Sequence, residues 1–299
     1  MKKVRTSFKM LFLLSCSLLL LSGFSYPPKP QSLGTNSNMK AVWLWDTPFI
    51  KENPASILAF AEQTGLDTIY LQMNRDVRPE YYKSFIKAAG KQNIEIHVLG
   101  GAPSWSLKSE RHRLDAFLTW TKEYQDAAAP EERFTGIHVD VEPHGLAQWK
   151  TNQADLIRQW QDNTRYLAEG ARALNLPITA DIPFWIYQYQ LPDGSMSMSR
   201  WMLTQMDGVA IMAYRDQADK IYSAAAVELK EADELGKKAW IAVETKSSNE
   251  GAFITFYEED APYMDEQLQL LNKKAALHSS FSGFAIHDYK AYKALVEKE

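Results

Sequence analysis

The chain has 299 residues, of which 45% are hydrophobic and 23% are charged. This composition is typical of a globular protein and excludes a disordered chain, a collagen-like repeat and a multi-span membrane protein. The 33 Lys and Arg residues against 37 Asp and Glu residues give a formal net charge of −4. An acidic chain of this kind is not expected to bind the phosphate backbone of a nucleic acid. The single cysteine, Cys16, excludes an intrachain disulfide and a cysteine-based metal site.

The first 25 residues have the pattern of an export signal. Basic residues at positions 2, 3, 5 and 9 precede an apolar stretch over 10–24, which is shorter than the roughly 20 residues that span a bilayer. The small residues Gly23 and Ser25 suit cleavage after Ser25. We therefore expect a signal peptide over 1–25, or an uncleaved membrane anchor, and a secreted or cell-envelope protein.

A lipoprotein is the alternative for this segment. The sequence LLSC over 13–16 would place a lipid on Cys16, but the residues after it stay apolar, unlike the polar linker of a lipoprotein. Contact with a membrane is therefore expected only through the N-terminal segment, if that segment is uncleaved or lipidated. Residues 26–39 are rich in Pro, Ser and Asn and predict a linker before a single domain over 40–299.

Eight short apolar runs follow along the chain at a regular spacing. They are rich in Val, Ile and aromatic residues, which is typical of β-strands, and they lie at 41–46, 68–73, 94–101, 136–143, 177–183, 208–214, 239–245 and 283–289. The stretches between them predict helices at 54–65, 79–92, 111–128, 147–175, 218–235 and 261–277. Strands that alternate with helices over about 250 residues predict an α/β fold, a single (β/α)8 TIM barrel. A doubly wound open sheet is the alternative, but no glycine-rich phosphate loop follows the first run.

The active site of such a barrel lies at the carboxyl ends of the strands. Polar residues gather at these ends, at Asp46, Gln72, Asn74, Asp140, Glu142, Asp181, Tyr214, Asp216, Glu244 and His287. The tryptophans expected near them are Trp43, Trp45, Trp105 and Trp185. Aromatic rings stack on sugars and carboxylates supply acid–base catalysis, so this combination predicts a binding site for an oligo- or polysaccharide.

Strand four carries the most informative pattern. His138, Asp140 and Glu142 alternate with apolar residues, so all three are expected to face the barrel interior, with Glu142 nearest the mouth. We expect His138 to hold the charge of Asp140, and Asp140 to tune the pKa of Glu142 as an acid catalyst requires. By the same alternation Glu244 ends strand seven on the interior face, across the barrel from strand four.

Two segments resemble family 18 glycoside hydrolases, the chitinase-like group. Asp140-Val141-Glu142 is similar to the end of the strand-four signature DxxDxDxE of that family, and Gly136 matches its usual glycine. Thr135 and His138 stand where the signature has its two other acids.

The second segment is Met212-Ala213-Tyr214, which resembles the Met-x-Tyr of strand six in the same family. His287 stands where a tryptophan is expected near the end of strand eight.

The resemblance implies a glycosidase in which the acetamido oxygen of the substrate attacks C1. Glu142 would then be the general acid, Asp140 would orient the acetamido group, Tyr214 would help to hold it, and Glu244 would be a subsite residue. A second resemblance is to the clan of retaining glycosidases whose acid ends strand four and whose nucleophile ends strand seven. It would make Glu142 the acid and Glu244 the nucleophile.

The sequence therefore predicts an exported glycoside hydrolase that acts on a polysaccharide or cell-wall glycan without a cofactor. The alternative is a non-catalytic carbohydrate-binding or envelope protein on a degenerate barrel. A metal site at His138, Asp140, Glu142 and His144 is not favoured, because barrel metal sites draw their ligands from several strands.

Overall fold

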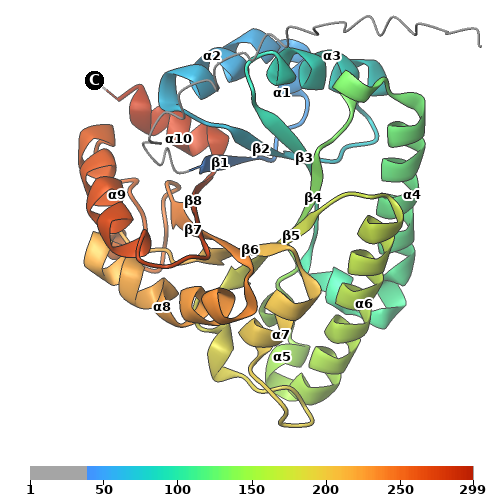
Figure 1. Ribbon diagram of the computed structural model, residues 1–299, viewed down its shortest axis with the longest axis vertical. Helices are drawn as coiled ribbons and strands as arrows, with labels where there is room; N and C mark the ends of the chain where they lie inside the picture. Colours follow the sequence, from blue (N-terminus) through green and yellow to red (C-terminus); the bar gives the residue numbers. More distant parts are fainter. Residues whose placement is uncertain (1–38, 299) are drawn as a thin grey trace, which may run out of the picture. The chain divides into compact units, whose positions relative to one another are not determined.

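The computed structural model describes residues 39–298, which form a closed barrel of eight parallel strands in the order β1 to β8 (Figure 1). The predicted single TIM barrel is confirmed. The predicted signal peptide over 1–25, Cys16 and the predicted linker up to residue 38 lie outside the described residues. Strand β1 begins at Met39, one residue before the predicted start of the domain.

All eight predicted strands are present. Their bounds are β1 Met39–Leu44, β2 Thr68–Gln72, β3 Glu95–Gly100, β4 Gly136–Val139, β5 Ile178–Pro183, β6 Gly208–Met212, β7 Lys238–Glu244 and β8 Phe281–His287. Strand β4 is shorter than predicted and ends at Val139, so Asp140 and Glu142 lie on the loop that leaves it. The barrel closes where β1 pairs with β8.

The helices surround the barrel (Figure 1). Their bounds are α1 Phe49–Glu52, α2 Pro54–Thr64, α3 Pro79–Gly90, α4 Arg111–Ala127, α5 Gln148–Thr151, α6 Gln153–Ala173, α7 Met198–Gln205, α8 Ala218–Leu235, α9 Ala261–Ala275 and α10 Tyr289–Val296. The helix predicted over 147–175 is two helices, because Asn152 leaves the helical conformation at φ −151° and ψ 53°. The sequence patterns did not predict α7 and α10, which have eight residues each.

Two separate hydrophobic cores follow from the alternation of side chains along the strands. The larger core lies between the strands and the helices, and includes Val42 and Leu44 of β1. Their neighbours Ala41 and Trp43 point inward. They join a small cluster that fills the barrel, whose other buried members are Tyr70, Leu99, Ala210, Trp240, Ala242 and Ala285. The barrel interior is therefore a packed core that supports the groups at its mouth.

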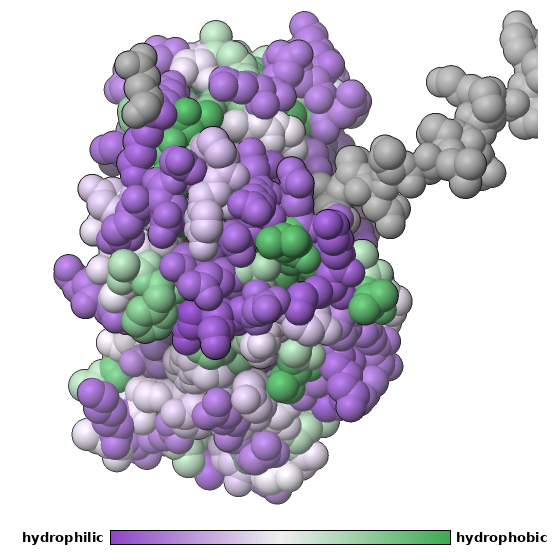
Figure 2. Space-filling view, turned by 90° about the vertical axis from the view of Figure 1, so that its left-hand side faces the viewer, coloured by the Kyte–Doolittle hydropathy of each residue, from purple (hydrophilic) through white to green (hydrophobic). Residues whose placement is uncertain are grey.

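The outer faces of the helices are mostly hydrophilic. Figure 2 shows one side of the molecule, where hydrophobic residues form only small separate patches. No helix within residues 39–298 is long and apolar enough to cross a membrane.

Candidate active site

The predicted catalytic residues of strand four lie at the carboxyl end of the barrel, where a close backbone contact fixes Asp140. A Cβ atom on Gly101, at the end of β3, would lie 1.9 Å from the backbone oxygen of Asp140. The Asp140 backbone amide also donates to the Gly100 carbonyl at 3.0 Å. Only glycine at position 101 lets the two loops approach this closely.

Asp140 and Asp181 form a pair of neighbouring carboxyl groups. The last register pair of β4 and β5 is Val139 with Ala180, so the next position on each chain holds one of the two aspartates. Burial raises the pKa of Asp140 well above its usual range, and the charges of Asp181 and Glu142 raise it further. Burial also raises the pKa of Asp181 to about 8. Each of these two buried carboxyl groups therefore disfavours the ionisation of the other.

The expectation that His138 holds the charge of Asp140 is wrong. His138 is fully buried, and its Nε2 lies 3.0 Å from Oδ1 of Asp181, while its Nδ1 lies 2.7 Å from Oγ1 of Thr179. Burial lowers the pKa of His138 to about 3, so the ring is neutral at physiological pH. The imidazole of His138 therefore contacts side chains of the neighbouring strand β5, not Asp140 on its own segment. The buried Oδ1 of Asp140 has no hydrogen-bond partner among residues 39–298.

Glu142 is half-buried and contacts a histidine. Oε2 of Glu142 lies 3.2 Å from Nε2 of His144. Burial raises the pKa of Glu142, and His144 opposes that rise. The ring of His144 packs edge-on against Trp185 at 5.0 Å, and Trp185 contacts Trp149 at 6.1 Å and Tyr189 at 5.6 Å. An aromatic cluster therefore borders Glu142 on the side of β4 and β5.

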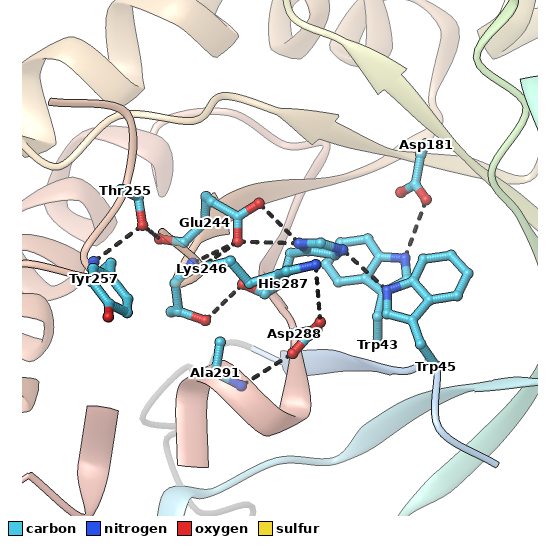
Figure 3. Close-up of polar contacts among 11 residues, drawn as sticks. Trp43, Trp45, Asp181, Glu244, Lys246, Thr255, Tyr257, His287, Asp288 and Ala291 are labelled. Carbon is cyan, nitrogen blue, oxygen red and sulfur yellow. Dashed lines mark hydrogen bonds and ion pairs between the residues drawn. The ribbon is translucent and has the colours of Figure 1, made fainter. Parts of the chain in front are cut away.

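Glu244 is held by several donors at the end of β7 (Figure 3). Its Oε1 accepts the backbone amides of Thr245 at 2.9 Å and Lys246 at 2.8 Å, and Nδ1 of His287 lies 2.9 Å from its Oε2. The indole of Trp45 donates to Nε2 of His287 at 3.0 Å. An indole nitrogen only donates, so Nε2 is unprotonated here and Nδ1 carries the hydrogen that faces Glu244.

Tyr214 lies within the electrostatic reach of carboxyl groups from the ends of β4, β5 and β7. Burial raises its pKa well above the usual range, and the charges of four carboxyl groups raise it further, those of Glu244, Asp181, Asp140 and Glu142. Its ring lies 6.3 Å from that of His287. Met212 is half-buried at the end of β6, two residues before Tyr214.

Two of the predicted tryptophans are buried and do not line the site. Trp43 is 1% exposed and Trp105 is 8% exposed, so neither presents a ring face to a ligand as expected. Trp43 instead donates its indole hydrogen to Oδ2 of Asp181 at 3.1 Å, inside the barrel.

The polar residues at or just after the ends of β1, β2 and β6 lie at the rim. Gln72 donates to the backbone oxygen of Met73, and its own side-chain oxygen is buried without a partner among the described residues. Asn74 caps a turn by accepting the amide of Asp76. Asp46 is exposed, and Asp216 is half-buried with its pKa raised by burial.

Sequence reasoning did not select several residues that the structure places in this region. Thr179 was not selected because a threonine within a strand carries no distinctive signal. Trp149 was not selected because it falls within a predicted helix, and His144 was considered only as a metal ligand. Arg215 and Phe253 were also missed, although Arg215 directly follows the Met-x-Tyr segment. Within residues 39–298, no group of three or more His, Cys, Asp and Glu side chains is arranged to hold a metal ion.

The chain has recognisable structural neighbours although no protein-family model and no curated protein matches its sequence. A chitinase from Bacteroides thetaiotaomicron is 13% identical with a TM-score of 0.54, covering 85% of this chain and 90% of that one. A class V chitinase mutant from Cycas revoluta, in complex with (GlcNAc)3, is 13% identical with a TM-score of 0.52, covering 86% and 97%.

A GH18 chitinase from Pseudoalteromonas aurantia is another such neighbour. It is 10% identical with a TM-score of 0.52, covering 85% of this chain and 95% of that one. At this identity the likeness is one of fold. The chain is thus similar in its barrel fold to the GH18 chitinases, the family that its strand-four and strand-six residues resemble.

Proposed function

We propose that the protein is an exported glycoside hydrolase that acts on a polysaccharide or cell-wall glycan, with Glu142 as its general acid. The observation that carries this proposal is the position of Glu142 beside Asp140 at the barrel mouth. Burial raises the pKa of Glu142, which keeps a proton available for a leaving group. The aromatic cluster that borders Glu142 offers faces of the kind on which sugar rings stack.

Asp140 is the preferred partner of Glu142. The two residues are two positions apart on one loop, so their Cα atoms are at most about 7 Å apart and Asp140 cannot stand across a sugar from the acid. It can orient an acetamido group, which requires an N-acetylated substrate. The Oδ1 of Asp140, which has no hydrogen-bond partner among residues 39–298, supports this role, as does the (GlcNAc)3 bound to a structural neighbour.

Glu244 is the weaker candidate for a partner. Oε1 of Glu244 accepts the amides of Thr245 and Lys246, and Oε2 faces Nδ1 of His287, so three groups already orient the carboxylate that a nucleophile would direct at the sugar. We therefore assign it the task of orienting His287, and with it Trp45, at the rim of the site.

Hydrolysis of N-acetylglucosamine oligomers and of a panel of chromogenic glycosides tests the proposal. The purified protein should release products from at least one acetylated substrate. Glu142→Gln should lower kcat by about 10²–10⁴-fold on a substrate with a poor leaving group, because the amide has no acidic proton. Glu123→Gln, an exposed change on α4, is the matched control and should keep wild-type turnover.

A non-catalytic carbohydrate-binding protein is the second candidate. His138 and His287 favour it, because they stand where the chitinase-like pattern has an acid and a tryptophan. Binding of the same oligomers without turnover would decide for this candidate, and absence of both binding and turnover would overturn the glycan function.

Export is part of the proposal and has its own test. The basic residues and the apolar stretch of the first 25 residues support it. The mass of the mature protein from an exporting host should correspond to a chain that begins at Tyr26. A full-length cytoplasmic product would contradict export, and a lipid on Cys16 would decide for the lipoprotein.

A further inference from the structure

An arginine is clamped between two aromatic rings beside the candidate catalytic groups. Arg215 directly follows Tyr214, and its guanidinium carbon lies 4.9 Å from the ring centre of Phe184 and 5.5 Å from that of Phe253. One of its terminal nitrogens donates to the backbone oxygen of Tyr214 at 2.6 Å. The loops after β5, β6 and β7 thus meet at this side chain. Because two aromatic rings and a backbone carbonyl hold the guanidinium in place, it loses little conformational entropy when it binds a ligand.

The charge of Arg215 is not neutralised by an ion pair. Among residues 39–298 its direct contacts are the two rings and the Tyr214 carbonyl, and its charge opposes the rise in the pKa of neighbouring Asp216 without an ion pair between the two side chains. Arg113, Arg165 and Arg200, by contrast, each pair with a carboxylate. A guanidinium has five N–H donors in a planar fork that matches a carboxylate with two parallel hydrogen bonds. Arg215 uses one nitrogen for the carbonyl, so donors remain for a ligand.

An exposed aromatic ring completes the arrangement. Phe253 is 54% exposed, although its backbone oxygen is fixed by a hydrogen bond from the Asp216 amide at 3.2 Å. A phenyl ring held in place yet left in water loses hydrophobic stabilisation that a sugar face can restore. The ring and the guanidinium are in contact, so a single sugar can cover both.

We propose that Arg215 and Phe253 form a subsite for a sugar that carries a carboxylate, so that the substrate is an acidic N-acetylated glycan. The inference rests on the proposed glycosidase function, which it deepens by naming the substrate class. The sugar stacks on Phe253 and its carboxylate accepts two hydrogen bonds from Arg215. Arg215 directly follows Tyr214, the residue that the family resemblance assigns to holding the acetamido group. Acetylated and acidic sugars therefore alternate or adjoin along the glycan.

Binding measurements with neutral and acidic probes of equal length test this subsite. The probes are the N-acetylglucosamine tetramer and the hyaluronan tetrasaccharide, with peptide-free peptidoglycan strands, whose lactyl ether carries the carboxylate, as a second acidic probe. The full chain should bind at least one acidic probe about tenfold more tightly than the neutral tetramer at low salt. This preference should shrink as the salt concentration rises, because it depends on charge.

Variants separate recognition from loop support. Arg215→Gln should abolish the preference for the acidic probe while changing the affinity for the neutral tetramer less than twofold. Arg215→Lys keeps the charge but not the fork, so it should retain part of the preference. Phe253→Ala should lower the affinity for both the neutral and the acidic probe. Arg200→Gln is the matched control, because its guanidinium already pairs with Glu234, and it should behave as wild type.

Each contrary result has a distinct meaning. Equal affinity of the wild type for all probes would overturn the acidic subsite and leave the glycosidase proposal standing. If Arg215→Gln lowers the affinity for neutral and acidic probes equally and also lowers the unfolding temperature, Arg215 supports the loops and the subsite proposal is overturned. Binding and hydrolysis of none of the probes would overturn both proposals.

Discussion

Glu244 shows how the hydrogen bonds of one residue limit its chemistry. Its carboxylate accepts two backbone amides and faces His287, so it serves as an anchor for the imidazole. The same residue was an open candidate for a nucleophile on sequence grounds, because a strand-end glutamate across from Glu142 satisfies that pattern. The contacts of the carboxyl oxygens, which no sequence pattern reports, favour the anchoring role.

A substitution with added azide tests this assignment. Glu244→Gln should lower activity, because an amide accepts fewer of these hydrogen bonds and frees His287 and Trp45. Added azide should not restore turnover, because no covalent glycosyl–enzyme intermediate depends on Glu244. The appearance of a glycosyl azide by mass spectrometry would show instead that Glu244 was the nucleophile.

At the scale of elements, the approach of the β3 loop to the β4 loop sets the position of Asp140. Gly101→Ala would place a methyl group 1.9 Å from the Asp140 backbone oxygen, so the loop must move. A displacement of about 1 Å can cost 10²-fold in rate. We expect kcat to fall by at least tenfold, with thermal unfolding monitored in parallel.

Gly90→Ala is the matched control for this change. Gly90 ends α3, and a Cβ there would meet nothing within 4 Å. This variant should keep full activity and wild-type stability or better, because alanine favours the helix. Wild-type kcat in Gly101→Ala would refute the positioning role of the loop contact.

Helix α8 carries a buried acid that makes stability depend on pH. Glu228 is fully buried, and neither carboxyl oxygen has a hydrogen-bond partner within the described range. Burial raises its pKa to about 9 and the charge of Glu231 adds to the rise, while the nearby backbone amides of Glu228 and Tyr187 oppose it. Its proton is held in the folded state, so the stability it contributes is full below its ordinary pKa and is lost as pH rises toward 9.

Glu228→Gln removes this dependence, because glutamine is neutral at every pH. Relative to wild type, the variant should gain free energy of unfolding between pH 5 and pH 9, by up to about 1.4 kcal/mol per pH unit. Urea unfolding at several pH values measures it. Exposed Glu123→Gln should leave the wild-type slope in place, and a slope unchanged in Glu228→Gln would mean that Glu228 is ionised when folded.

At the scale of the whole molecule, the barrel is closed by the seam between its first and last strands. Gly283 of β8 pairs with Met39 of β1, and a Cβ on Gly283 would lie 1.9 Å from the Met39 backbone oxygen. The φ of Gly283, +133°, is also one that residues with a side chain rarely adopt.

Gly283→Ala should therefore weaken the closed barrel as a unit. We expect a loss of about 1–3 kcal/mol in the free energy of unfolding, typical of an overpacked core, measured by urea denaturation. Gly90→Ala serves as the control here too. A free energy of unfolding equal to that of the wild type in Gly283→Ala would show that β1 and β8 can move apart without loss of stability.

The sequence by itself determined the barrel and the end of it at which the candidate site lies. Strand and helix periodicity depend on local side-chain chemistry, so alternating apolar runs revealed all eight strands, and the carboxyl ends of parallel strands always meet at one edge. Short helices such as α7 and α10 have too few turns to show a clear period, and they were missed.

Only the tertiary structure decided which polar groups pair. His138 was expected to contact Asp140 two residues away, but its ring spans to Asp181 on the next strand, and Trp43 turned inward to the same carboxyl group. Arg215 meets Phe184 and Phe253 from two other loops. Such pairs join residues distant in sequence, and their geometry depends on strand register and side-chain reach, which one strand's pattern does not contain.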